Sequence, residues 1–146
     1  MTHRMTFLLL IFLILLPSVL SGCASGSQVG ETDLKMAPMS ELPDEVKQAS
    51  VTVQDAYRFN VANPEIMKEI PCYCGCGDMG HASNYACYVQ DYTDGKITYD
   101  SHALGCSICV DITQDTMRML KEGKTVSEIK QIVDDTYSKF GPSNIP

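Results

Sequence analysis

The chain has 146 residues, of which 18 are acidic and 11 basic, so its formal net charge is −7. This acidic balance argues against a phosphate-backbone contact or a polybasic membrane contact, and we expect no nucleic-acid partner. The length suits one small domain, in which seven cysteines are the compositional outlier.

The first 22 residues have the pattern of a secretory signal peptide. Arg4 supplies a positive charge, and the unbroken apolar run over 7–16 is too short to cross a bilayer comfortably. The segment ends in Leu20-Ser21-Gly22-Cys23, which resembles a bacterial lipobox. In such signals the cysteine receives lipid chains such as palmitate and becomes the new N-terminus after cleavage.

We therefore expect a signal peptide over 1–22 and a lipid anchor at Cys23, which makes the membrane a partner of the protein. The location that follows is the extracytoplasmic face of a bacterial membrane. A plain signal peptide with an accidental cysteine and an uncleaved anchor are the alternatives.

Residues 23–50 have the composition of a flexible tether, and residues 51–146 that of a cysteine-rich folded domain. Serine, glycine and proline punctuate the first stretch without a sustained hydrophobic period. Flexible-chain scaling of about 5–6 Å times the square root of the residue number places the domain about 30 Å from the lipid on average. Met36 and Met39 are interpreted as methionines scattered along this tether.

Two helices are predicted at the start of the domain, over 53–62 and 64–69. Thr52-x-x-Asp55 resembles a helix N-cap with an acidic first turn, and apolar residues follow at helical spacing. Asn63-Pro64-Glu65 then has the pattern of a stop and a restart, with proline at the first helical position. A packed helix therefore holds the beginning of the loop that follows.

Three alternating cysteines form that loop, in Pro71-Cys72-Tyr73-Cys74-Gly75-Cys76-Gly77. Side chains two positions apart point the same way on an extended backbone, so the three sulfur atoms can converge on one point. Neighbours at this spacing are poorly placed to form a disulfide with each other. Sulfur atoms that converge without bonding suit a soft metal ion or a thiol-exchange centre.

The segment over 78–104 has no single pattern. Ser83 or Asn84 can cap a short helix that carries Cys87, and residues 88–99 around Asp94-Gly95 can equally form a small hairpin. Both interpretations stay open. The expected fold class is mainly α, a small single helical domain with an irregular cysteine-rich middle segment that contains no more than a short hairpin.

The last third of the chain predicts two further helices, over 107–122 and 126–140. Apolar residues and cysteines recur at i, i+3, i+4 and i+7, so Cys106-Ser-Ile-Cys109 lies at the start of the first helix. Gly123 ends that helix, and Thr125-Val-Ser-Glu128 is a capping box for the second. Thiolates at a helix N-terminus are favoured by its dipole, which serves metal binding and disulfide exchange alike.

Six cysteines remain once Cys23 is assigned to the lipid, and the two histidines outside the signal peptide lie among them. Metal ligation employs all eight side chains together, in two tetrahedral sites or in a thiolate cluster with fewer ions. Cys-x-Cys near Met79 favours Cu(I), and Cys-x-x-Cys has the spacing typical of Zn(II). The candidate ligands, expected to lie around one centre, are Cys72, Cys74, Cys76, His81, Cys87, His102, Cys106 and Cys109.

Three functions from different classes remain open. The preferred one is a metal-binding protein that scavenges, buffers or delivers a soft cation, Cu(I) before Zn(II). The second is a thiol–disulfide oxidoreductase with Cys106 and Cys109 as its redox pair. The third is a structural or interaction domain in which the cysteines form ordinary disulfides.

The run of motifs resembles the bacterial lipoproteins that are named for their PCYCGC motif. The resemblance covers roughly residues 53–146 and implies lipoprotein identity, but it supplies little mechanism. It rests on Pro71-Cys-Tyr-Cys-Gly-Cys76, Gly80-His81-x-Ser83-Asn84, Cys87, Tyr99-Asp-x-His102-Ala103 and Cys106-x-x-Cys109.

The C-terminal part is also similar to the thiol-reducing subunit of cytochrome c maturation, in which a Cys-x-x-Cys precedes two antiparallel helices. This resemblance implies that Cys106 and Cys109 reduce the haem-attachment cysteines of an apocytochrome. Leu104-Gly105 replaces the Leu-Arg of that family, and the alternating cysteines have no counterpart there. The matching positions are Cys106, Cys109, Met117-Arg118, Glu122-Gly123-Lys124-Thr125, Glu128-Ile129 and Tyr137.

Overall fold

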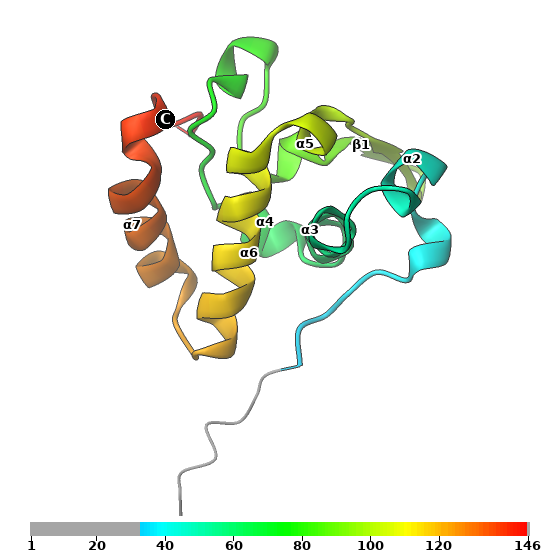
Figure 1. The fold of residues 1–146 in the computed structure, drawn as a ribbon, viewed down its shortest axis with the longest axis horizontal. Helices are drawn as coiled ribbons and strands as arrows, with labels where there is room; N and C mark the ends of the chain where they lie inside the picture. The colour runs from blue at the N-terminus through cyan, green and yellow to red at the C-terminus, as the bar shows by residue number, and fades with distance from the viewer. Residues whose placement is uncertain (1–32, 146) are drawn as a thin grey trace, which may run out of the picture.

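Six short to medium α-helices and one β-hairpin make up the fold of residues 33–145, the part of the chain that this computed structural model describes (Figure 1). The mainly helical class with an irregular cysteine-rich middle is confirmed. The expected signal peptide over 1–22 and the lipid anchor at Cys23 lie outside the described residues. The elements are α2 (Asp44–Lys47), α3 (Val51–Ala62), α4 (Pro64–Met67), β1 (Val89–Thr93), β2 (Lys96–Tyr99), α5 (His102–Gly105), α6 (Ser107–Lys121) and α7 (Val126–Tyr137), with 3-10 turns η1 (Met39–Glu41), η2 (Cys76–Met79), η3 (Tyr85–Cys87) and η4 (Ser138–Phe140).

Helix α6 lies between α3 and α7 and forms the centre of the core (Figure 1). Its buried residues recur at helical spacing along one face, from Cys109 through Ile112 and Thr116 to Met119. Phe59 of α3 and Val133 of α7 are fully buried as well. Each such apolar side chain contributes about 1.5–3 kcal/mol by leaving water, so this packing fixes the start of α6.

The ends of the long helices follow the predicted signals closely. Thr125 and Glu128 form both hydrogen bonds of a capping box at the start of α7. Gly123 adopts a left-handed φ of 80° directly after α6, which a glycine tolerates without strain. The last turn of the predicted helix over 126–140 is the 3-10 turn η4.

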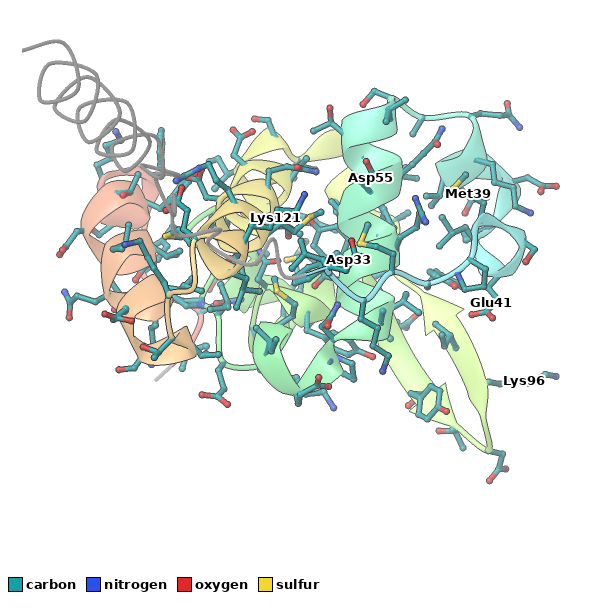
Figure 2. The ribbon with its side chains drawn as sticks, turned by 90° about the horizontal axis from the view of Figure 1, so that it is seen from below. Asp33, Met39, Glu41, Asp55, Lys96 and Lys121 are labelled. Carbon is teal, nitrogen blue, oxygen red and sulfur yellow. The ribbon has the colours of Figure 1, made fainter. Side chains whose placement is uncertain are left out.

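The short helix and the hairpin predicted for the middle segment are both present, on adjacent residues, but the Asn84 side chain makes no capping hydrogen bond. The 3-10 turn η3 carries Cys87, and the antiparallel pair β1 and β2 follows it around Asp94-Gly95. Both turn residues have positive φ, at 52° and 76°, as a tight hairpin turn requires. The hairpin projects away from the helices, with Lys96 pointing outward from β2 in Figure 2.

The flexible tether predicted over 23–50 is too long at its C-terminal end. Residues 34–47 pack against the domain, where Leu42 and Val46 are almost fully buried. The Tyr99 hydroxyl donates to the Glu41 carbonyl at 2.9 Å, and Figure 2 shows Met39 and Glu41 on the segment beside α3. The apolar residues here have no helical or strand period, because each fills a separate gap, and this explains why the pattern predicted no structure.

Two boundaries near α3 and α4 also differ from the prediction. Helix α3 begins at Val51 with Ser50 as its N-cap, two residues earlier than expected. Helix α4 ends at Met67 instead of residue 69. The Asn63 side chain does not cap α4 but donates to the carbonyls of Phe59 and Lys35, which ties the N-terminal segment to α3.

We predict that Leu42→Ala lowers the free energy of unfolding by about 2–5 kcal/mol, because it removes a buried side chain and leaves a cavity. Urea unfolding of the chain from residue 24 onward, followed by circular dichroism, measures this. Val51→Ala is the matched control, since Val51 is 70% exposed and its truncation changes the free energy by less than about 0.5 kcal/mol. Equal stabilities for the two variants would contradict this packing and favour a flexible tether that extends to residue 50.

Candidate metal centre

All six cysteines and both histidines predicted as ligands converge beside the N-terminus of α6. They come from the loop after α4, from η2 and the loop that follows it, from η3, from α5, and from the N-cap and first turn of α6. The ligand atoms fall into overlapping groups in which every atom lies within 4.8 Å of the others. These groups are Cys74-His102-Cys106-Cys109, Cys76-His81-Cys87-His102, Cys72-Cys87-Cys109 and Cys72-Cys74-Cys76.

The alternating cysteines converge as their spacing predicts. Gly75 then takes a left-handed φ of 82°, a conformation that favours glycine, and the chain turns directly into η2. Cys72 and Cys76 are buried, whereas Cys74 is half-buried. The loop thus presents sulfur atoms both to the interior and to the rim of the centre.

Three sulfur atoms form a nearly equilateral triangle. Cys72 Sγ lies 3.4 Å from Cys74 Sγ and 3.4 Å from Cys109 Sγ, and Cys74 Sγ lies 3.5 Å from Cys109 Sγ. A disulfide needs about 2.05 Å, and all six described cysteines are free thiols. Zn–S bonds near 2.3 Å place tetrahedral ligands about 3.8 Å apart, so this triangle is close to one face of a coordination sphere.

The two histidines stand against the thiols on the rim. His102 Nε2 lies 3.4 Å from Cys74 Sγ. The rings of His81 and His102 meet edge to face with their centroids 5.1 Å apart. Further inside, Cys76 Sγ and Cys87 Sγ lie 3.5 Å apart, and both residues are buried. Cysteine and histidine side chains together are a donor set for a soft or borderline cation.

The close contacts among the thiols shift their pKa values in opposite directions. Hydrogen bonding from Cys109 lowers the pKa of Cys72 to about 7, and the same donor lowers the pKa of Cys76 well below its usual range. Burial raises the pKa of Cys74. Hydrogen bonding to Cys72 raises the pKa of Cys109. These shifts arise from the close contacts among the thiols, and a cation that binds here displaces thiol protons.

A buried hydrogen-bond network holds the backbone of Cys109 in place. The Asn84 side chain and the Thr113 hydroxyl both donate to the Cys109 carbonyl, at 3.2 Å and 3.1 Å. The one hydroxyl proton of Thr113 is shared between that carbonyl and Asn84 Oδ1, which lies at 2.8 Å, and the Thr113 oxygen accepts from the Tyr88 hydroxyl at 2.9 Å. Because these groups are buried and satisfied, they fix the first turn of α6 rigidly.

Asn144 is a supporting residue that the sequence pattern did not reveal. Its Oδ1 accepts the Cys72 backbone N–H at 2.7 Å, and its own N–H donates to the Cys72 carbonyl at 3.2 Å. Its Nδ2 reaches the His81 carbonyl at 2.9 Å and Cys76 Sγ at 3.5 Å. A Cβ on Gly141 would lie 2.8 Å from the Tyr73 carbonyl oxygen, so this glycine lets the segment approach the loop. No local signal marks these contacts, since they join residues more than 60 positions apart.

Met79 is not part of the centre. It lies at the end of η2 and is 58% exposed, so the thioether that the sequence suggests as a Cu(I) donor points to solvent.

Asp100 contacts both histidines, although it is not among the site residues that the sequence predicts. Its Oδ2 lies 3.4 Å from His81 Nε2, and its Oδ1 accepts the His102 backbone N–H at 2.7 Å.

A cavity of about 300 Å³ opens beside Cys106, between the N-terminal part of α3, α5 and the first turn of α6. Cys106 is half-buried, and it alone of the six thiols lines this cavity. The thiol centre is thus reachable from solvent at Cys106.

None of the helices within residues 33–145 has the length and the apolar character that a membrane span needs.

Residues 12–144 match the model of a family described as "Protein of unknown function with PCYCGC motif". Searches of curated proteins and of solved structures gave no match. The similarity to the thiol-reducing subunit of cytochrome c maturation therefore stays a prediction.

We predict that Asn144→Ala lowers the free energy of unfolding of the reduced, chelator-treated protein by about 1–3 kcal/mol, because it leaves buried groups of the cysteine loop unpaired. It should also speed the reaction of the buried thiols with a thiol-specific reagent. Urea unfolding and the rate of thiol modification measure the two effects. Lys139→Ala, an exposed change on the same segment, should alter neither. Identical thiol reactivity in the two variants would show that Asn144 does not hold the loop.

Proposed function

The chain belongs to the PCYCGC-motif family, and we propose that it is a lipid-anchored, extracytoplasmic protein that binds a soft metal cation through its cysteines and histidines. The observation that carries this proposal is the packing of six free thiols and two imidazoles into overlapping groups at ligand spacing. The role that fits is scavenging, buffering or delivery of the cation at the membrane surface.

The state of the thiols supports ligation over the other uses of cysteine. Small extracytoplasmic domains ordinarily oxidise their cysteines in structural pairs. Here sulfur atoms lie 3.4–3.5 Å apart without a bond, in a triangle that involves three residues at once. Three mutually adjacent thiols cannot all be satisfied by one disulfide, whereas one cation engages all three.

The donor set suits Cu(I) and Zn(II) in different ways. The group of Cys74, Cys106, Cys109 and His102 has the Cys₃His composition of structural zinc sites. Thiolates are softer than imidazoles and prefer Cu(I), which also accepts fewer ligands. We propose that both cations bind and that Cu(I) binds more tightly, because the thiol triangle alone satisfies it.

A thiol–disulfide oxidoreductase is the second candidate, and one observation favours it. Cys106 is half-buried at the N-cap of α6, beside a cavity, which is where an attacking thiol needs to be. Its partner Cys109 is fully buried against Cys72 and Cys74, however. In that position it is shared with the other thiols, which favours joint ligation over exchange within one pair.

We predict that Cys74→Ser weakens binding of Cu(I) and Zn(II) about as strongly as Cys109→Ser, because both remove a member of the same triangle. The reduced variants are titrated with each metal against a competing chelator. Met79→Leu is the control and should bind like wild type, since its thioether faces solvent. The same proteins are assayed for insulin reduction, which an oxidoreductase using Cys106 and Cys109 retains in Cys74→Ser.

The two functions give opposite patterns in this experiment. Tight binding that is lost in both cysteine variants, with negligible reductase activity, is the expected result. Absence of metal binding by wild type, with reductase activity lost in Cys109→Ser alone, would overturn the proposal and favour the oxidoreductase.

The anchor is tested separately on the full chain produced in a bacterium. We predict that labelled palmitate is incorporated and that the protein fractionates with membranes. Cys23→Ala should abolish both, because it removes the thiol that carries the lipid. Cys74→Ser is the matched control and should keep label and fractionation, and label retained in Cys23→Ala would disprove the anchor.

A further inference from the structure

We propose that the centre holds two cations, the second on Cys76, Cys87 and His81, with Cys72 as the thiolate that links the two sites. This inference rests on the proposed function and adds to it the number of ions and the division of the ligands. It also assigns Asp100 as the residue that positions both histidines.

Four further ligands remain once one tetrahedral set is filled. A tetrahedral cation takes four ligands. The group of Cys74, Cys106, Cys109 and His102 supplies four, all within 4.8 Å of one another. The four ligands not in this group are Cys72, Cys76, Cys87 and His81. Within that remainder, Cys76 Sγ and Cys87 Sγ lie 3.5 Å apart, and a ligand atom of His81 lies within 4.8 Å of both.

Cys72 lies between the two sets. Its Sγ is 3.4 Å from Cys109 and 3.4 Å from Cys74, which belong to the first site. It also lies within 4.8 Å of Cys76 and of Cys87, which belong to the second. A buried sulfur with two neighbours in each site is placed to bridge two cations, as thiolates with several lone pairs do.

His81 carries an independent sign of a ligand. Its Nδ1 is buried and has no hydrogen-bond partner, although an unpaired buried polar atom costs about 1–3 kcal/mol. Its Nε2 faces Asp100 Oδ2 at 3.4 Å, so the ring proton belongs on Nε2 and the lone pair on Nδ1. An imidazole that donates to a carboxylate from one nitrogen and coordinates through the other is the usual arrangement of a metal-bound histidine.

Asp100 holds both histidines from one position. Its Oδ1 accepts the His102 backbone N–H at 2.7 Å, while Oδ2 faces His81. The backbone of Asp100 is itself fixed, because its N–H donates to the Tyr88 carbonyl at 2.9 Å and its carbonyl accepts the Tyr57 hydroxyl at 2.7 Å. One carboxylate directly after β2 thus faces the ring of His81, a ligand of one site, and holds the backbone of His102, a ligand of the other.

The experiment counts Zn(II) on the reduced chain from residue 24 onward by native mass spectrometry, with chelator competition for the affinities. Wild type should bind two ions. His81→Ala and Cys87→Ser should each bind one, and His81→Cys should restore the second, since a thiolate replaces the imidazole as ligand. A purely structural role of His81 would not be rescued in this way.

Asp100→Asn tests the positioning role with little change of shape. It should still bind two ions but with the weaker affinity lowered about 10–100-fold, the range for loss of a carboxylate behind a ligand. Asp78→Asn, an exposed acidic residue on η2, is the control and should bind like wild type. Circular dichroism of each variant separates a loss of ligand from a loss of fold.

The outcomes distinguish this inference from the function on which it rests. One ion on wild type, unchanged in His81→Ala, would overturn the second site and leave metal binding intact. No ion on wild type would overturn both. Two ions on His81→Ala and on Cys87→Ser would overturn the assignment of ligands.

Discussion

Cys109 connects the helical core to the cysteine loop, and the geometry of the centre depends on where its sulfur lies. The residue is fully buried on the first turn of α6, and its Sγ contacts Cys72 and Cys74 at 3.4 Å and 3.5 Å. Its carbonyl accepts hydrogen bonds from the side chains of Asn84 and Thr113. Because α6 is in turn packed between α3 and α7, the core determines the position of one vertex of the thiol triangle.

The loop itself has little regular structure to hold it in place. Between α4 and β1, the described backbone forms only the short turns η2 and η3, so its order comes from side chains. Cys72, Cys76 and Cys87 are buried there as small apolar groups, and Asn144 binds the loop from the outside. A cation shared by this loop and α6 would join segments distant in sequence, so its binding free energy would stabilise the fold as well as the site.

The sequence predicts what short-range patterns determine. The capping box at Thr125 and Glu128 and the alternation of Cys72, Cys74 and Cys76 are local, and the structure has both. The role of Asn144 and the contact of Asp100 with His81 arise between residues distant in the sequence, for which neither residue carries a local signal. The packing of residues 34–47 was missed for the same reason, because its apolar side chains follow no period.

Burial divides the centre into an interior and a rim, and this division bears on how easily each thiol is oxidised. Cys72, Cys76, Cys87 and Cys109 are buried, whereas Cys74 and Cys106 are half-buried. Oxidation requires a thiolate to attack a disulfide or an oxidant, and a thiolate bound to a cation is a poorer nucleophile. Formation of any one disulfide would also draw two sulfur atoms from about 3.4 Å to about 2.05 Å apart, away from their other neighbours. In the proposed metal-bound state, ligation would therefore protect the interior thiols from oxidation. Cys106, which lines the cavity, would be the thiol at which a cation is exchanged.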